Sequence, residues 1–367
     1  RGEGHGMLLL MPIDKATELN ATIYGVIKGS SIGHSGKTNT LTSPNPFSQS
    51  RVIQQAHEAA GITSDQVSFV ELHGTGTKLG DPLEIQGLKR AFRATRAKNA
   101  AHSPCYLSTV KTNIGHLESA AGIAGVIKVL LSFANKTISP LQNFDNLNPK
   151  ISLKKSPFEV VTNAQSWPNE AMQTKTRIAG VSSFGFAGVN AHLILQEPPL
   201  APHTTAQSDN LDPVLNQSMA FILSAKSKPA LMQRASQLSD YLNNTPATDL
   251  DLRSVAYTLQ TGREAMAYRL GFIASSATDA LSQLECYLEN TPSAWHVDKV
   301  SKATLDNPQV FDIGKLNVTL HDSLKAWING ESVDWQQLYL DATPRRISLP
   351  SYPFSQSKHW IDTNRLA

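Results

Sequence analysis

The sequence predicts an α/β protein with two units, a layered domain over residues 1–197 and a smaller α/β domain over residues 218–340. Three observations lead to this prediction. Short runs of aliphatic and β-branched residues alternate with amphipathic stretches, in the β-α-β-α-β-α-β-β order of a mostly parallel, layered sheet. The length of 367 residues is too great for one small domain. Residues 198–217 are polar and contain several prolines, which is typical of a linker.

In the first unit, apolar runs and helical periodicity alternate along the chain. Strands are predicted at residues 6–12, 23–31, 67–72, 105–111, 178–183 and 190–196, and helices at residues 48–60, 82–94 and 118–134. Gly61 is expected to end the first helix, because glycine tolerates the left-handed conformation found there. Asp81 precedes Pro82, and we expect this pair to cap and begin the second helix. A polar loop is expected to begin at Gly33.

The second unit shows the same alternation on a smaller scale. Strands are predicted at residues 220–224 and 268–274, and helices at residues 229–243, 252–261, 278–289 and 331–339. Trp335 is expected to anchor the last helix in the core. Residues 341–367 alternate prolines with large apolar side chains, a pattern that cannot be regular and suits a strap laid over another surface.

Composition excludes several classes of function. The hydrophobic content of 40% supports packed cores, and a net charge of +3 is too small to indicate binding to nucleic acid or to an acidic membrane. No stretch reads as a membrane span or a signal peptide. Cys105 and Cys286 lie in different regions, which argues against a disulfide framework or a thiolate metal site and favours a cytoplasmic location. Arg1 is followed almost at once by an apolar run, so we expect the chain to begin inside a longer domain.

Two histidines are the first candidates for catalysis. His73 and His116 each follow a predicted strand and precede a predicted helix, so both should lie at one edge of the sheet. Two imidazole N–H groups there can stabilise one developing oxyanion. Lys111, at the end of the second of these strands, could orient the pair or tune its charge.

Neighbouring residues could hold a substrate. Thr75 and Thr77 offer hydroxyl groups to an amide-bearing arm, and the turn around Phe186 offers backbone N–H groups. Cys105 begins an apolar strand and is better interpreted as a buried small hydrophobe than as a nucleophile.

Structural explanations compete with these roles. A lone histidine beside a glycine is more often structural than catalytic, by roughly three to one. That is how we interpret His5, His34 and His192. No acidic or thiol partner accompanies His73 and His116 at ligand spacing, which disfavours a metal site. The residue types alone therefore leave acid/base catalysis as one interpretation among others.

Three long motifs resemble a known family and occur in its order. They are E-L-H-G-T-G-T-K-L-G-D-P-L-E, V-K-T-N-I-G-H-L-E-S-A-A-G and G-V-S-S-F-G-F-A-G-V-N-A-H-L-I-L. Together they resemble the C-terminal half of a β-ketoacyl synthase domain from a modular polyketide synthase, over residues 1–197. The resemblance implies a thiolase-like fold of two similar halves, with residues 6–12 as the last strand of the first half. The family's catalytic cysteine would then lie upstream of Arg1.

The resemblance implies an acyltransferase of the 3-oxoacyl-[acyl-carrier-protein] synthase type, which carries out a decarboxylative Claisen condensation. His73 and His116 would bind the thioester carbonyl of a malonyl-type unit, with Lys111 in support. Thr75 and Thr77 would contact the phosphopantetheine arm of acyl carrier protein, and Phe186 matches a gating residue. No cofactor or metal bound by this segment is implied. The motif departs from the family at residues 187 and 189, where alanine and valine replace glycine and threonine.

The second unit resembles the linker domain that follows such synthases, and residues 341–367 resemble the strap that returns to the synthase. The stretch between the two recognisable pieces of this unit is too short for an acyltransferase domain, which implies an acyltransferase acting in trans. The remaining half of the synthase and other modules are implied partners, and the intact domain is expected to be a homodimer. Two alternatives remain: a synthase that transfers the chain without elongating it, and a non-catalytic scaffold, because the nucleophile is absent from this chain.

Overall fold

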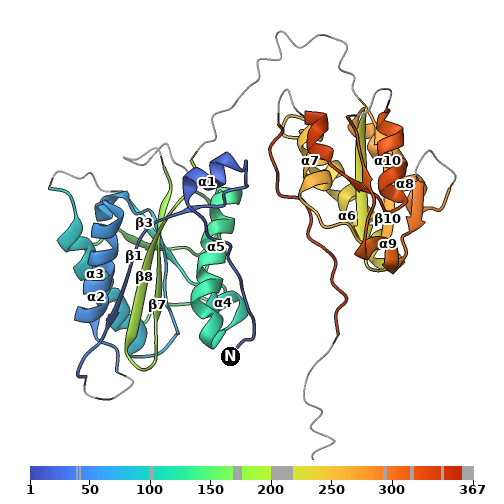
Figure 1. Ribbon diagram of the computed structural model, residues 1–367. Coiled ribbons are helices and arrows are strands. Elements are labelled where there is room, and N and C mark those ends of the chain that lie inside the picture. Colours follow the sequence, from blue (N-terminus) through green and yellow to red (C-terminus); the bar gives the residue numbers. More distant parts are fainter. Residues whose placement is uncertain are drawn as a thin grey trace, which may run out of the picture. The chain divides into compact units, whose positions relative to one another are not determined.

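The computed structural model describes residues 1–38, 40, 43–98, 103–167, 176–199, 218–291, 296–314, 318–339 and 343–357 (Figure 1). The chain forms two compact units, one from the described residues of Arg1–Ile13 and Ile23–Thr204, the other from those of Asp14–Thr22 and Thr205–Ala367. Most of the predicted linker, residues 200–217, lies outside the described residues.

A mixed sheet forms the centre of the first unit, and within the described residues it has six strands in the order β1-β8-β7-β2-β3-β5. The strands are β1 (Val26–His34), β2 (Phe69–Glu71), β3 (Cys105–Ser108), β5 (Phe158–Val160), β7 (Ile178–Phe184) and β8 (Val189–Gln196). Strands β7, β2, β3 and β5 pair in parallel, and β8 pairs antiparallel with both β1 and β7. The carboxyl ends of β2, β3 and β7 therefore meet at one edge of the sheet.

Helices cover both faces of this sheet (Figure 1). Helices α2 (Pro46–Ala60) and α3 (Gly80–Thr95) lie on one face, and α5 (Ala121–Asn135) lies on the other. Alternate strand residues supply the two cores: Val70 packs with α2 and α3, while its neighbour Phe69 packs with α5. This arrangement confirms the predicted layered α/β class with a mixed sheet.

Capping explains where α2 begins and ends. The Asn45 side chain accepts hydrogen bonds from the N–H groups of residues 47 and 48, Pro46 opens the helix, and Gly61 ends it with φ 64°. The prediction for α3 was wrong in its first residues. Helix α3 begins at Gly80 without a side-chain cap, and the Asp81 carboxylate instead accepts a hydrogen bond from the Gly76 N–H at 3.1 Å. Asp81 thus braces the preceding loop.

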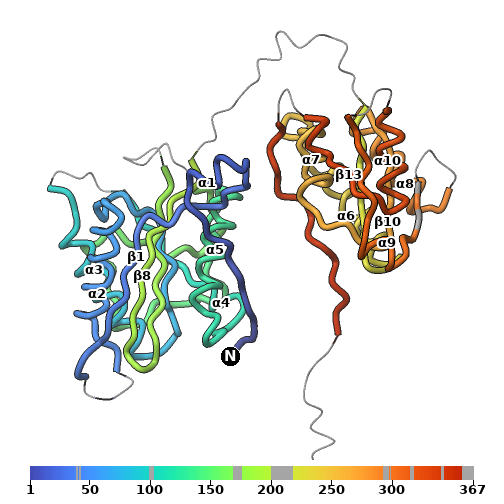
Figure 2. The backbone as a smooth tube through the Cα atoms, in the orientation of Figure 1, coloured from blue at the N-terminus to red at the C-terminus, as the bar shows by residue number. Residues whose placement is uncertain are grey.

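The strand predicted at residues 6–12 is not formed. These residues are irregular or begin the short helix α1 (Ile13–Glu18), and Met7 and Leu9 are 89% and 88% exposed. Figure 2 traces the segment past α4 and α5, where residues 3–6 line a cavity of about 580 Å³ together with apolar side chains of α5. A strand requires a ladder partner, and this path offers helix side chains instead of a sheet edge.

Other boundaries also differ from the prediction. Strand β1 continues to His34, so the polar loop begins later than Gly33. Lys111 does not end a strand but begins the single-turn helix α4 (Lys111–Ile114). The region after α5, for which no helix or strand was predicted, contains β4 (Thr137–Ile138), β5 and β6 (Gln165–Ser166). The predicted helix at residues 118–134 is a 3₁₀ turn, η2 (Glu118–Ala120), followed by α5.

Within the described residues, Glu118–Asn135 is long and apolar enough by composition to cross a membrane. Its residues Val126, Val129 and Phe133 pack in the core on one face of the sheet. We therefore interpret it as the core helix of a layered domain.

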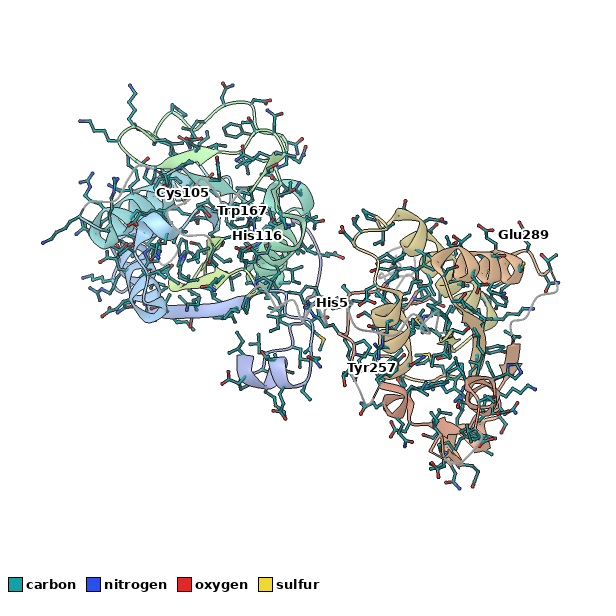
Figure 3. All side chains as sticks on the ribbon, turned by 90° about the horizontal axis from the view of Figure 1, so that it is seen from above. His5, Cys105, His116, Trp167, Tyr257 and Glu289 are labelled. Atoms are coloured by element: carbon teal, nitrogen blue, oxygen red, sulfur yellow. The ribbon has the colours of Figure 1, made fainter. Side chains whose placement is uncertain are left out.

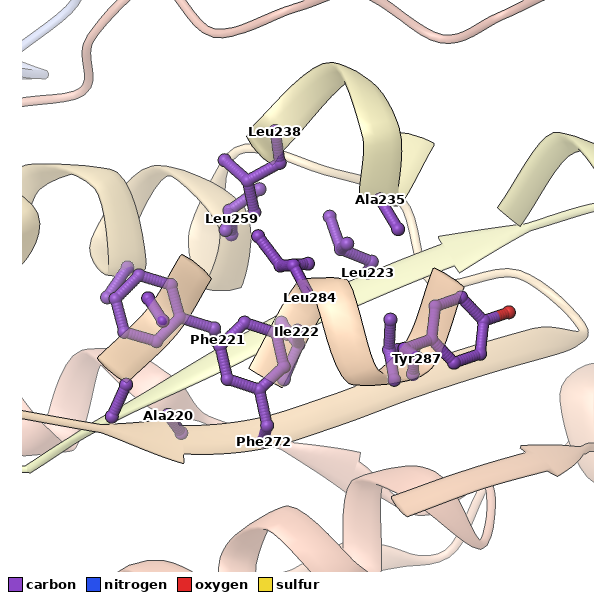
Figure 4. Packing of buried hydrophobic residues seen from close by; sticks show 14 of the residues in the cluster. Ala220, Phe221, Ile222, Leu223, Ala235, Leu238, Leu259, Phe272, Leu284 and Tyr287 are labelled. Atoms are coloured by element: carbon purple, nitrogen blue, oxygen red, sulfur yellow. The ribbon is translucent and has the colours of Figure 1, made fainter. Parts of the chain in front are cut away.

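In the second unit, helices pack on a small antiparallel sheet. The sheet has the order β11-β10-β9, from β9 (Met219–Ala225), β10 (Tyr268–Ala274) and β11 (His296–Lys299). The main helices are α6 (Lys228–Asn244), α7 (Leu252–Thr261), α8 (Ala277–Leu288) and α10 (Leu320–Ile328). Phe221 and Phe272 stack at 5.3 Å between ring centroids in the core (Figure 4). The smaller elements are α9 (Lys302–Asp306), β12 (Val310–Phe311), β13 (Ser332–Val333) and η3 (Trp335–Tyr339).

The end of the chain packs on this same core. Ile347, Leu349 and Tyr352 contact the buried cluster of the second unit, and the Ile347 N–H donates to the Thr258 hydroxyl at 3.0 Å. The return of the predicted strap to the synthase stays a prediction, because residues 358–367 lie outside the described residues. The predicted helix at residues 331–339 was wrong in type: it is β13 followed by a 3₁₀ helix, in which Trp335 is buried.

Candidate active site

The structure brings His73 and His116 together at the carboxyl edge of the sheet. His73 lies two residues after β2, and His116 lies just after α4, which follows β3. Because β2 and β3 are parallel neighbours, both side chains reach the same edge. Their ring centroids are 5.8 Å apart, and the ring planes are nearly perpendicular at 87°.

Backbone hydrogen bonds set which nitrogen of each ring carries the proton. The Phe184 N–H donates to Nδ1 of His73 at 3.3 Å, and the Glu118 N–H donates to Nδ1 of His116 at 2.9 Å. A neutral imidazole that accepts at Nδ1 carries its proton on Nε2. This network assigns both rings as Nε2–H donors.

His73 is held in its neutral form. Burial, and then electrostatic interactions with Lys111 and His116, lower the pKa of His73 to about 3. At neutral pH its ring is therefore a hydrogen-bond donor and not a cation. A neutral imidazole can donate a hydrogen bond to a carbonyl oxygen. It can keep donating as that oxygen becomes the oxyanion of an enolate, without transferring its proton.

A buried carboxylate positions the His73 loop. It was not among the residues expected to act in the site. Glu84 of α3 accepts hydrogen bonds from the N–H groups of His73 and Gly74, at 2.7 and 2.8 Å. Burial raises the pKa of Glu84 to about 7, and these two backbone bonds oppose that shift. The sequence carried a signal for this role, because Glu84 is an acidic residue on the apolar side of a predicted helix.

A second buried group supports the other side of the site. Glu71 of β2 pairs with Lys128 of α5 at 2.8 Å, and Lys128 also donates to the Ser108 hydroxyl at 2.8 Å. The other Glu71 oxygen accepts from the Val110 N–H at 2.5 Å. Burial raises the pKa of Glu71, while the Lys128 ammonium opposes the shift. The network ties the turn that leads to His116 to the helix beneath it.

Lys111 acts on this site through its charge. It opens α4, and burial lowers its pKa while the carboxylates of Glu71, Glu84 and Asp81 oppose that shift. Its positive charge contributes to the depressed pKa of His73.

The predicted substrate-binding residues lie on two loops, Thr75 and Thr77 between β2 and α3, and Phe186 between β7 and β8. Thr75 is half-buried, whereas Thr77 is exposed and its hydroxyl already accepts a hydrogen bond from the Gly80 N–H at 2.9 Å. Phe186 lies on the turn between β7 and β8 and is 80% exposed. The aromatic ring that contacts His73 is Phe184, two residues earlier, at 5.7 Å between centroids.

Cys105 lies at the opposite end of β3 from the histidines. Figure 3 labels Cys105 and His116 among the side chains of the first unit. Cys105 is 1% exposed, and burial raises the pKa of its thiol. A thiol in that state is a poor nucleophile, as the sequence predicted. His192 is also buried, with its Nδ1 bonded to the Ser182 hydroxyl at 3.0 Å. Among the described residues, no group of three or more His, Cys, Asp or Glu side chains could hold a metal ion.

Two protein families match the two units. Residues 24–145 match the family model described as "Beta-ketoacyl synthase, C-terminal domain", and residues 222–291 match "RhiE-like, KS-MAT linker domain". Polyketide synthase PksN of Bacillus subtilis is 42% identical over 98% of this chain, which covers 7% of that relative. Polyketide synthase ThaG of Burkholderia thailandensis is 38% identical over 98% of this chain and is covered to 6%.

Solved structures agree with the family match. The ketosynthase from module 6 of the bacillaene synthase of Bacillus subtilis is 36% identical, with a TM-score of 0.80. The match covers 95% of this chain and 60% of that ketosynthase chain. The chain therefore spans about three fifths of the solved ketosynthase and a small part of the curated relatives.

Proposed function

Because the chain belongs to the β-ketoacyl synthases of polyketide synthases, we propose that its first unit supplies the two-histidine wall of an active site for decarboxylative condensation. The second unit is the linker domain that follows the synthase. One observation carries the proposal most directly. Two imidazoles, with ring centroids 5.8 Å apart, each accept a backbone N–H at Nδ1, which leaves Nε2–H as the donor that could bind a substrate oxygen.

The chemistry follows from those two donors. The substrate would be a malonyl-type thioester on the phosphopantetheine arm of acyl carrier protein, with its carbonyl oxygen bound by the Nε2–H groups of His73 and His116. As the C–C bond to the carboxylate breaks and carbon dioxide leaves, the electron pair moves into an enolate whose oxygen these donors stabilise. The enolate carbon then attacks an acyl thioester, the new C–C bond forms, and the cysteine thiolate leaves.

Other residues would position this pair or the substrate arm. Glu84 fixes the backbone of His73, and Lys111 keeps positive charge beside the developing enolate. Thr75 and Thr77 would contact the phosphopantetheine arm. Phe186, exposed on its turn, would act at the entrance of the site.

The thiolate would come from the remaining half of the synthase. The exposed apolar residues near the N-terminus and on α5, among them Met7, Leu9 and Leu131, supply a surface for that half. We also propose a trans-acting acyltransferase and other synthase modules as partners, and a homodimer for the intact domain. A cytoplasmic location fits two cysteines with free thiols.

The test is His73→Ala in the intact synthase, measured as carbon dioxide release from malonyl carrier protein. Loss of one oxyanion donor should slow decarboxylation about 100- to 1000-fold, or roughly 3 kcal/mol of barrier. Loading of the acyl group on the cysteine should continue, because His73 acts in the later step. His321→Ala, an exposed position in the second unit, is the control.

Decarboxylation that His73→Ala leaves unchanged would contradict the enolate role. A wild-type enzyme that transfers acyl groups but releases no carbon dioxide would identify the alternative, a synthase that does not elongate.

A further inference from the structure

Three arginines surround a cavity of about 220 Å³ that lies wholly within the second unit. Arg234 comes from α6, Arg269 from β10, and Arg263 from the turn that follows α7. They approach from three separate elements, so their charges converge on one space. Nothing in the condensation chemistry proposed above uses this cavity.

Two of these guanidinium groups are buried without a carboxylate partner. Arg234 and Arg269 are 6% and 3% exposed. Arg234 donates to the Ser224 carbonyl at 2.7 Å, and Arg269 donates to the carbonyls of Met266 and Trp327. Neither forms an ion pair within the described residues, where the buried pairs are Lys128–Glu71 and Arg177–Glu197 of the first unit.

Burial without a counter-charge is unfavourable for a cation. It lowers the pKa of Arg269 to about 10 and also lowers that of Arg234, to which the nearby charge of Arg263 contributes. Each guanidinium has five N–H donors in a fork, and its hydrogen bonds to carbonyl groups use only one or two of them. The remaining N–H groups and the positive charge of both guanidinium groups are therefore available to a group bound in the cavity.

Trp335 also lines the cavity and is 3% exposed. Its indole N–H is buried away from the open space and has no hydrogen-bond partner among the described residues, so Trp335 gives the cavity apolar surface and no donor. Two acidic residues, Glu264 and Glu331, also line the cavity, but neither forms an ion pair with the three arginines in the described part of the chain.

We propose that this cavity binds a tetrahedral oxyanion of the phosphate class. A planar carboxylate is satisfied by one guanidinium fork, whereas donors arriving from Arg234, Arg263 and Arg269 suit an anion that accepts from several directions. The volume of about 220 Å³ is many times the roughly 10–15 Å³ needed to hold one water, so a phosphate group fits together with bridging waters.

The site adjoins the C-terminal strap. Arg263 donates to the carbonyls of Leu349 and Pro350 at 3.2 and 3.4 Å, and the Tyr352 ring lies 6.0 Å from the Arg234 guanidinium. A bound anion would therefore add acceptors beside the same arginines that hold the strap on this unit.

Isothermal titration of the full chain with inorganic phosphate, at constant ionic strength in chloride, tests the proposal. We expect saturable 1:1 binding and a higher melting temperature. Arg234→Gln should weaken binding about tenfold or more, in line with loss of a charge-assisted contact. Arg263→Gln removes the exposed arginine of the three and should weaken binding roughly threefold or more. Lys302→Gln removes an exposed charge on α9 and should leave the affinity unchanged.

Sodium acetate and 4′-phosphopantetheine are the comparison ligands. Acetate should bind at least about tenfold more weakly than phosphate. Binding of phosphopantetheine would identify a carried phosphate as the source, and binding of inorganic phosphate alone would identify the free anion. Absence of saturable binding, equal affinity for acetate, or an unchanged affinity in Arg263→Gln would overturn the proposal. Because Arg263 is exposed, this variant keeps the test decisive if Arg234→Gln fails to fold.

Discussion

At the scale of single residues, the site depends on where protons reside. His73 and His116 share one feature: the Nδ1 atom of each accepts a backbone N–H. The donor is Phe184 for His73 and Glu118 for His116. These contacts select the Nε2–H tautomer, and burial keeps His73 neutral. A protonated His73 would lose its Nδ1 acceptor and would repel the Lys111 ammonium.

The low pKa of His73 links the site to acid stability. Its folded pKa of about 3 lies below the ordinary value of 6.5, so between these values the unfolded chain binds more protons. Its contribution to folding stability is therefore fully present above pH ~6.5 and is lost progressively as pH falls toward 3.

Histidine ¹⁵N NMR of the chain from pH 5 to pH 8 checks these assignments. We expect His73 and His116 to carry the proton on Nε2 at neutral pH, and His73 not to titrate in this range. His73→Gln identifies its resonance. A His73 proton on Nδ1, or a His73 midpoint near 6.5, would contradict the assigned geometry.

At the scale of elements, close contacts between backbones hold the first unit's layers in place. Gly29 of β1 packs directly on α2: a β-carbon there would lie 2.5 Å from the Ala60 nitrogen and 2.8 Å from the Ala56 oxygen. Neither atom can move without shifting the helix backbone. By contrast, a β-carbon at Gly33 of the same strand would meet only the end of the Val52 side chain, at 2.8 Å.

Gly29→Ala should therefore destabilise the first unit by about 1–3 kcal/mol, a typical cost of overpacking. Gly33→Ala is the matched control and should cost less, because one side-chain methyl group of Val52, and no helix backbone, must give way. Hydrogen-exchange protection of β1 and β8 in urea measures both free energies of opening. An equal loss in the two variants would show that α2 can shift away from the strand.

The difference between local and long-range signals explains which elements could be predicted from the sequence. Periodicity and the end signal Gly61 are local, so the last residue of α2 was predicted correctly. Its start at Pro46, capped by Asn45, lies two residues before the predicted one. A strand depends on a partner elsewhere in the chain, so residues 6–12 were predicted as a strand and form none. The 3₁₀ turn at Trp335 likewise depends on packing that periodicity does not record.

The site followed a similar division. His73 and His116 could be placed at one edge because each follows a strand, and chain order is visible in sequence. The hydrogen bonds from the His73 loop to Glu84, and the ion pair of Glu71 with Lys128, could not be predicted. They join residues that are 10 to 57 positions apart in the sequence. The predicted Phe186 lies on the exposed turn, whereas Phe184 reaches His73, since β7 continues through Phe184.

At the scale of the whole molecule, two units with separate cores carry different chemistry. The first presents paired imidazoles at a sheet edge, and the second surrounds a cavity with buried arginines. The thiol at Cys105 is buried at the far end of β3, away from the imidazoles. We therefore propose that His73 and His116 work only with a thiolate from the remaining half of the synthase.

Acyl transfer to the chain, alone and co-expressed with that remaining half, tests this claim most directly. Each preparation is incubated with an acyl carrier thioester and then with malonyl carrier protein, and intact mass and carbon dioxide are measured. We predict no acyl mass on this chain alone, and in the complex an acyl group on the partner half followed by carbon dioxide release that depends on His73. Acyl mass at Cys105 of the isolated chain would contradict the account.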